Sequence, residues 1–119
     1  MSRTVLVCGG RTFHDGGLVE QTLNQLHAHT PITHLVHGGA QGADRLGGLW
    51  AWSMKIRCTV VHPDWVKHGK RAGPLRNQEM LDTYAPSLVV AFPGGRGTED
   101  MVRRAIDAGV AVFVPSPKT

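Results

Sequence analysis

Three glycine-rich segments contain the backbone amides and side chains best suited to bind a phosphate group. They are residues 8–12, 37–44 and 93–98. Glycine has no Cβ, so a ligand can approach the neighbouring amides closely, and an arginine or hydroxyl in the same segment adds donors. The candidate ligand-binding residues of these segments are Gly9, Gly10, Arg11, Thr12, Gly38, Gly39, Asp44, Gly94, Gly95, Arg96, Gly97 and Thr98.

Several polar side chains in these segments have two interpretations. Arg11 and Arg96 can each fold over a bound phosphate or point into solvent. We expect Thr98 to cap the helix that follows through its Oγ and also to donate to phosphate. Asp44 can accept hydrogen bonds from ribose hydroxyls, but an acidic residue in the first turn of a helix is favourable without any ligand.

Further candidates lie in a basic stretch between the second and third glycine segments. Residues 62–74 form the longest segment expected to be irregular, and its length and charge are typical of a functional loop. Trp65 can stack on a base or pack the loop down. Arg76 has a planar guanidinium that suits bidentate phosphate binding, and Asn77 can bind ligand, cap a helix or hold the loop. Five positively charged or histidine residues lie close together in and just after this segment and suggest an anionic ligand: Lys67, His68, Lys70, Arg71 and Arg76.

The elements that must position these residues alternate along the chain. Short apolar runs at 5–8, 35–36, 59–61, 88–92 and 110–114 are rich in β-branched residues and predict strands buried on both faces. Helical spacing follows between them, with a weak helix at 75–84, and on the second helix we expect Leu46, Leu49, Trp50 and Met54 to share the buried face. This pattern predicts an α/β fold, a Rossmann-like doubly wound parallel sheet of about five strands in the order 3-2-1-4-5 with helices on both faces. The glycine segments would then meet at the carboxyl edge of the sheet.

Composition limits the class of protein. The 119 residues fit a single domain, 1–119, with 41% hydrophobic and 18% charged residues and a net charge of +4. No apolar run is long enough to span a membrane and no secretory segment precedes the first strand, so we expect a cytoplasmic protein without membrane contact. Neither cysteine belongs to a metal-ligand pattern, and we expect no metal site and no cofactor.

In combination, the motifs resemble a known superfamily. Pro93-Gly94-Gly95-Arg96-Gly97-Thr98 resembles the PGGxGT signature of the SLOG superfamily, which includes the lonely-guy enzymes and the DNA-processing protein A group. The segments at residues 8–13, 37–44, 63–65 and 73–77 resemble the small stand-alone YspA-type branch. The resemblance covers nearly the whole chain. It implies a Rossmann-like domain that binds or senses a nucleotide or nucleotide-derived ligand, and a homodimer or larger homo-oligomer.

The same resemblance raises the question of catalysis. Lonely-guy enzymes cleave the N-glycosidic bond of nucleoside monophosphates with an arginine and a glutamate, which correspond by resemblance to Arg76 and Asp100. The PGGxGTxEE pattern of those enzymes is broken here, because Asp100 is one methylene shorter and Glu99 lies one place early. Ligand binding without cleavage, a phosphoribohydrolase activity, and single-stranded DNA binding through the basic stretch are therefore three hypotheses, with the first favoured.

Overall fold

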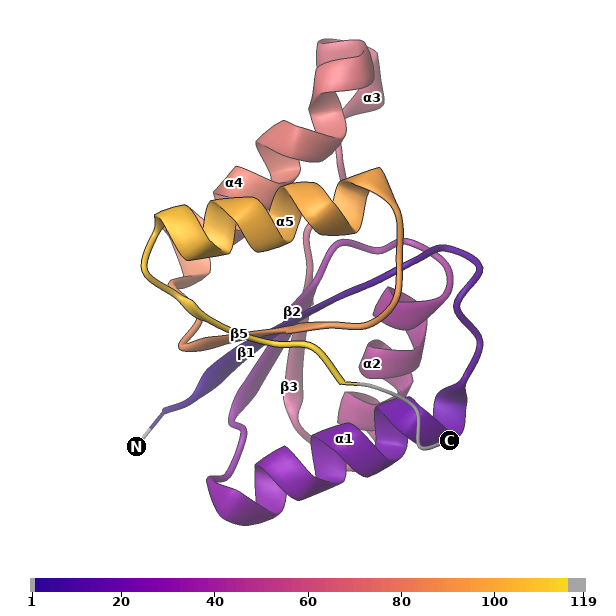
Figure 1. Cartoon of the computed structure of the whole chain (residues 1–119), viewed down its shortest axis with the longest axis vertical. Coiled ribbons are helices and arrows are strands. Elements are labelled where there is room, and N and C mark those ends of the chain that lie inside the picture. The colour runs from indigo at the N-terminus through magenta and orange to yellow at the C-terminus, as the bar shows by residue number, and fades with distance from the viewer. Residues whose placement is uncertain (1, 116–119) are drawn as a thin grey trace.

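The computed structural model describes residues 2–115, and strands alternate with helices along this part of the chain (Figure 1). The strands are β1 (Thr4–Cys8), β2 (His34–His37), β3 (Arg57–Val60), β4 (Leu88–Ala91) and β5 (Ala111–Phe113). The helices are α1 (Gly16–His29), α2 (Ala43–Ser53), α3 (Trp65–His68), the 3-10 turn η1 (Gly69–Arg71), α4 (Ala72–Tyr84) and α5 (Arg96–Asp107). Within residues 2–115, none of these helices has the length and apolar character needed to cross a membrane.

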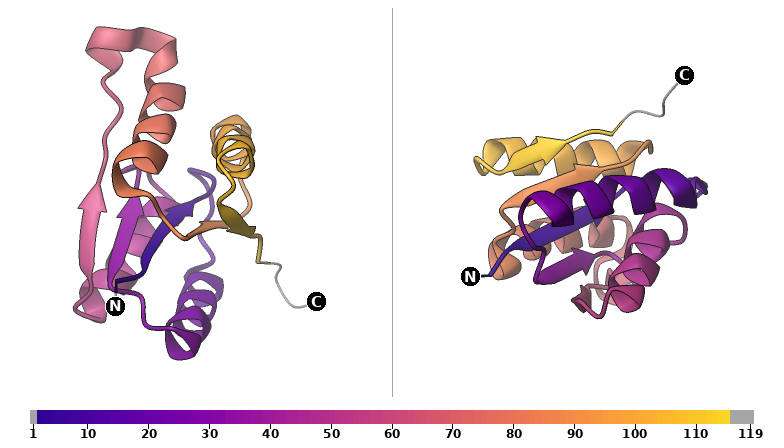
Figure 2. Two further views of the ribbon diagram at one scale, coloured as in Figure 1. Left: turned by 90° about the vertical axis from the view of Figure 1, so that its left-hand side faces the viewer. Right: turned by 90° about the horizontal axis from the view of Figure 1, so that it is seen from below.

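The five strands form one parallel sheet in the order β3-β2-β1-β4-β5, which confirms the predicted topology. Val5 of β1 is in register with Leu35 of β2 on one side and with Leu88 of β4 on the other. Helices α1 and α2 cover one face of the sheet, and α4 and α5 cover the other (Figures 1 and 2). The chain reverses its direction of winding between β1 and β4, so a crevice opens at the carboxyl ends of these two strands.

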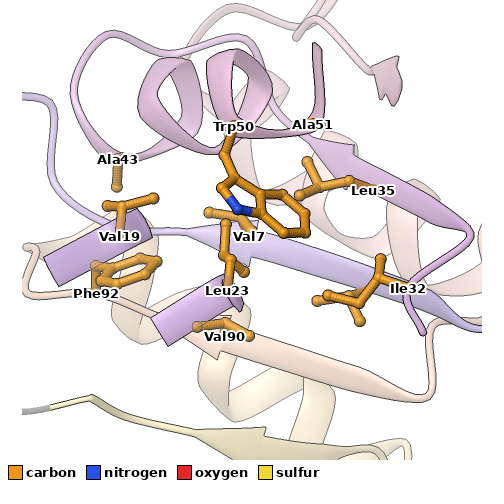
Figure 3. Close-up of a cluster of buried hydrophobic side chains, with 11 residues drawn as sticks. Val7, Val19, Leu23, Ile32, Leu35, Ala43, Trp50, Ala51, Val90 and Phe92 are labelled. Atoms are coloured by element: carbon orange, nitrogen blue, oxygen red, sulfur yellow. The ribbon is translucent and has the colours of Figure 1, made fainter. Parts of the chain in front are cut away.

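Alternation along the central strands divides the core into two layers. On one face, Val5 and Val7 pack with residues of α1 and α2, including Leu23 and Trp50 (Figure 3). On the other face, Leu6 packs in a layer that α4 and α5 complete. The three central strands are therefore buried on both sides, as their unbroken apolar runs predict.

The two outer strands correct the expectation that every strand is buried on both faces. Three of the four residues of β3 are exposed, as are Ala111 and Phe113 of β5. These strands lie at the two edges of the sheet, where a strand has a hydrogen-bonding neighbour on one side only. β-Branched composition predicted the strands correctly, but it does not distinguish an edge from the centre.

The segment expected to be irregular, residues 62–74, is instead largely helical. The Asp64 side chain accepts a hydrogen bond from the Lys67 amide at 3.0 Å and caps α3. Helix α4 begins at Ala72 rather than at residue 75. Pro74 lies within its first turn, where proline is tolerated because an amide at this position would have no hydrogen-bond partner within the helix. The segment forms an arm that projects beyond the sheet (Figures 1 and 2).

Helix α2 differs from its predicted orientation. Its buried residues are Ala43, Asp44, Gly47, Trp50 and Ala51, whereas Leu49 and Met54 are exposed. A Cβ at Gly47 would lie 3.1 Å from Cγ1 of Val7, so the helix lies so close to the sheet that any side chain here would need Val7 to shift by a few tenths of an ångström. The Gly47-Gly48 pair, which lowers helix propensity, is therefore explained by close packing against the sheet.

Replacement of Gly47 tests this packing. We expect Gly47→Val to lower the free energy of unfolding by about 1–3 kcal/mol, because the added methyl groups would overlap the side chain of Val7. Urea denaturation followed by circular dichroism measures the loss. Arg45→Val on the exposed face of α2 is the control for valine's helix propensity, and an equal loss in both variants would contradict the packing argument.

Candidate functional site

A cleft of about 1580 Å³ lies at the carboxyl ends of the strands. All three glycine segments contribute to its lining, together with residues of the segment after β3 and the start of α4. The structure thus brings together every residue that the sequence predicted for ligand binding or catalysis. Those residues are Gly9, Gly10, Arg11, Thr12, Gly38, Gly39, Asp44, Trp65, Arg76, Asn77, Gly94, Gly95, Arg96, Gly97, Thr98 and Asp100.

The first glycine segment joins the other two through backbone contacts. The Gly10 amide donates to the Pro93 carbonyl at 2.8 Å, and the Gly10 carbonyl accepts from the Ala43 amide at 3.3 Å. A Cβ at Gly94 would lie 2.6 Å from the Gly10 nitrogen. Glycine is therefore required here by the packing of one loop against another.

The second glycine segment is held by Asp44. One carboxylate oxygen, Oδ2, accepts from the Gly38 amide at 3.0 Å and the Ala40 amide at 3.2 Å. Burial raises the pKa of Asp44 to about 6, and the amide bonds together with the charge of Arg76 offset only part of this effect. These two amides already bind a carboxylate of the same chain, which corrects the expectation that all three segments offer open amides to a ligand.

Arg76 is more constrained than the sequence indicated. Its Nη1 donates to the carbonyls of Gly38, at 2.5 Å, and Val61, at 3.4 Å, while its Nε donates to Asn77 Oδ1 at 3.0 Å. A Cβ at Gly38 would lie 2.7 Å from the guanidinium carbon, so this glycine makes room for Arg76. Among residues 2–115, Nη2 has no hydrogen-bond acceptor, so a ligand can be bound through Nη2 but not through the fully open fork that was expected.

Asn77 links the two candidate catalytic residues. Its Oδ1 accepts from Arg76, and its Nδ2 donates to Asp100 Oδ2 at 3.0 Å and to the Gly97 carbonyl at 3.2 Å. The side chain is buried. Of the interpretations open from sequence, the structure shows Asn77 holding the third glycine segment.

The negative charge of Asp100 is balanced by two arginines of its own helix. Its carboxylate accepts from Arg103 Nη2 and from Arg104 Nε, each at 2.8 Å. Burial alone would raise the pKa of Asp100, but the hydrogen bonds from Arg104 and Asn77 and the two arginine charges outweigh burial and hold the pKa below its ordinary value. Asp100 is thus an ionised carboxylate with three donors, while Glu99 is exposed on the same helix.

The start of α5 is the most open part of the cleft. Gly95 is the N-cap and no side chain caps the helix, so Thr98, in its first turn, does not have the predicted capping role. A Cβ placed at Gly95 or Gly97 would meet no atom within 4 Å. The first amides of α5 therefore lie in open space, and neither glycine is required by the packing of the chain.

Cationic and aromatic side chains border this open part. Arg11 and Arg96 are exposed, and Trp65, the first residue of α3, is 52% exposed. Lys70, one of the clustered basic residues of the sequence analysis, also lines the cleft, as does His62, which was not singled out from the sequence. The position of His62, directly after the third apolar run, was the signal that could have identified it. Within residues 2–115, no three His, Cys, Asp or Glu side chains are grouped in a way that could bind a metal.

Comparisons with known proteins agree with the fold. Residues 3–68 match the model of the YspA, cpYpsA-related SLOG family. The gene 61 protein of Mycobacterium phage D29 is 42% identical over an alignment of 119 positions, which covers 93% of this chain and 94% of that protein. The structure is also similar to that of DNA processing protein A of Streptococcus pneumoniae, with a TM-score of 0.75 and 19% identity over 98% of this chain. The chain covers 51% of that structure, about half its length, and at this identity the likeness concerns the fold.

The buried carboxylate gives a testable pH dependence. The pKa of Asp44 is about 6 in the folded protein and its ordinary value is 3.8, so the folded state holds this proton more tightly than the unfolded state does. Ionisation of Asp44 therefore costs stability as the pH rises from about 4 to about 6. Asp44→Asn keeps an acceptor oxygen but carries no charge. Its free energy of unfolding, relative to the natural protein, should increase over this range by on the order of 1–3 kcal/mol, measured by urea denaturation at each pH.

The control is Asp82→Asn on the exposed face of α4, for which the difference from the natural protein should not vary in this way. A constant difference for Asp44→Asn across the pH range would contradict the assignment.

Proposed function

The chain belongs to the YspA, cpYpsA-related SLOG family, and from this premise we propose that its cleft binds a nucleotide or a nucleotide-derived ligand through a phosphate group. The observation that carries the proposal is the start of α5, where uncapped amides and two glycines without packing partners border the cleft. Helix N-termini of this kind favour anions through both their free N–H groups and the helix dipole.

The phosphate would lie at α5 rather than at α2. The amides of the second glycine segment are occupied by Asp44, and a phosphate there would meet this buried carboxylate. At α5, Arg96 is exposed beside the open amides, and Arg76 retains Nη2 for a further contact. We therefore assign the third glycine segment as the phosphate site and the second as a support for Arg76.

The rest of the ligand would extend toward the arm. Trp65 is half exposed and lines the same cleft, and an indole face of this kind can stack on a nucleobase. The size of the cleft, about 1580 Å³, leaves room for a ligand larger than a mononucleotide. A binding or sensing role needs no further chemistry from these residues.

Gly97 allows ligand binding to be separated from folding. We expect Gly97→Ala to leave stability unchanged or to raise it by up to about 1 kcal/mol, because its Cβ meets nothing and alanine favours helices. The same Cβ would stand among the α5 amides and lower the affinity for a phosphate ligand by about tenfold or more. Gly17→Ala is the matched control, since Gly17 has the same position in the first turn of α1 and does not line the cleft.

Isothermal calorimetry with ADP-ribose, NAD, nucleoside monophosphates, cyclic nucleotides and a short oligothymidine identifies the ligand for this comparison. Binding of a nucleotide that is weakened by Gly97→Ala and not by Gly17→Ala supports the proposal. No binding to the folded protein would contradict it. Binding of the oligothymidine alone, with a steep loss as salt rises, would favour the single-stranded DNA hypothesis and assign the basic arm to the nucleic acid.

A second candidate is a phosphoribohydrolase, favoured by the hydrogen bonds through which Asn77 links Arg76 and Asp100. Against it, Asp100 already binds two arginines and has little remaining negative charge to stabilise an oxocarbenium-like transition state. We expect no release of free base from AMP above the uncatalysed rate, measured by chromatography of the products. Release that is lost in Asp100→Asn, with Asp82→Asn unaffected, would establish the hydrolase instead.

We also propose that the protein forms a homo-oligomer, as implied by its resemblance to other SLOG proteins. The exposed edge strand β5 and the neighbouring apolar side chains of Ile106 and Val114 offer a surface on which copies can pair. Light scattering after gel filtration determines the assembly.

A further inference from the structure

Helix α2 has a stripe of side chains that points directly away from the protein. Arg45, Leu49 and Trp52 are spaced four and three residues apart, so they lie in one line along the helix. This line is on the opposite side from the buried residues Gly47 and Trp50. Leu49 is 53% exposed and Trp52 is 80% exposed, so the packing of residues 2–115 leaves more than half of each residue open to solvent.

Folding gives no reason for a tryptophan at position 52. Its neighbour Trp50 lies among the core side chains (Figure 3), and its indole nitrogen donates to Asn24 Oδ1 at 2.8 Å. Trp52 has no comparable packing, and the exposed face of a surface helix is ordinarily polar. Two large apolar side chains at its centre are characteristic of an interaction surface, in which tryptophan is enriched.

The charged side chains that α2 and the start of β3 expose near this stripe all have the same sign. Arg45, Lys55 and Arg57 are all exposed, and residues 45–60 contain no aspartate or glutamate. The acidic residue of α2, Asp44, is buried and bound to the second glycine segment. The α2 face, as we call this surface, therefore has an apolar centre, and the charged side chains that α2 and the start of β3 expose around it are all cationic.

We propose that the α2 face binds an acidic segment of another protein, in which an apolar side chain packs on Leu49 and Trp52 while carboxylates pair with Arg45, Lys55 and Arg57. The cationic border requires a partner of opposite charge, because like charges brought together at an interface are strongly unfavourable. Such a partner acts on the side of the sheet covered by α1 and α2, and its binding is independent of the nucleotide proposed for the cleft.

A second copy of this chain does not meet the charge requirement. If two α2 helices packed antiparallel about a two-fold axis between Leu49 and Trp52, Arg45 of one copy would face residues 55–57 of the other. Parallel packing would set Arg45 against itself. A lipid surface is also disfavoured, because two outward apolar side chains on an eleven-residue helix bury too little area to insert.

A library of randomised peptides displayed on phage tests the proposal, with the full chain as bait and Trp52→Ala as the counter-selection bait. The expected peptides combine aspartate or glutamate with an aromatic or aliphatic residue. A synthetic peptide of the selected sequence should bind Trp52→Ala and Arg45→Glu each at least about tenfold more weakly than the natural protein, measured by fluorescence anisotropy. It should bind Trp65→Ala, the control for a half-exposed tryptophan elsewhere, with unchanged affinity. The thermal stability of the variants confirms that they are folded, since all three side chains are exposed.

Several results would overturn the proposal. Selection of no peptide, of peptides without acidic residues, or of peptides that bind Trp52→Ala as well as the natural protein would each do so. Concentration-dependent dimerisation lost in Trp52→Ala would assign the α2 face to a second copy. Binding to phosphatidylglycerol vesicles that is lost in Trp52→Ala would assign it to a membrane.

Discussion

The site depends on the contact of backbone with backbone at Gly10. The first glycine segment lies between the start of α2 and the third segment, and Gly10 bonds to both through its carbonyl and its amide. A Cβ at Gly94 would collide with the Gly10 nitrogen, so the loops can approach one another only because these residues have no side chain. β1 and β4, which are neighbours at the switch point of the sheet, thereby bring the first and third glycine segments together, and the start of α2 bonds to the first. Everything else in the cleft is positioned relative to this junction.

Much of the polar chemistry at the junction serves the protein itself. Asp44 binds the amides of the second segment, Arg76 binds a carbonyl of the same segment, and Asn77 connects Arg76 to the third segment. A buried polar group without partners is costly, so a network of this kind makes the loops rigid in the absence of ligand. What remains open is the start of α5 and one nitrogen of Arg76. These open groups are the part of the junction that the chain's own hydrogen bonds leave available to a ligand.

The sequence predicted the central part of the fold well because its signals are local. Unbroken β-branched runs and alternating helices define the sheet and its strand order, and the glycine segments follow the strands directly. The errors arise where tertiary contacts decide. β3 and β5 have the composition of buried strands but lie at the edges, and the capping bond of Asp64 makes an expected loop helical. Likewise, no sequence pattern shows that Asp44 occupies two amides or that Asp100 is paired with Arg103 and Arg104.

Helix α2 shows why periodicity alone misassigned a face. Its apolar side chains suggested that Leu49 and Trp50 face the core together, yet the core side is built on Gly47, two alanines and a single tryptophan. The sheet approaches α2 closely at Val7, where position 47 has no room for a large side chain. Gly47 and the two alanines therefore share the buried face with Trp50 while Leu49 is left outside, which departs from the regular apolar stripe of an amphipathic helix. A close helix-to-sheet contact thus gives a chain of this size an apolar outer face that its own folding does not use.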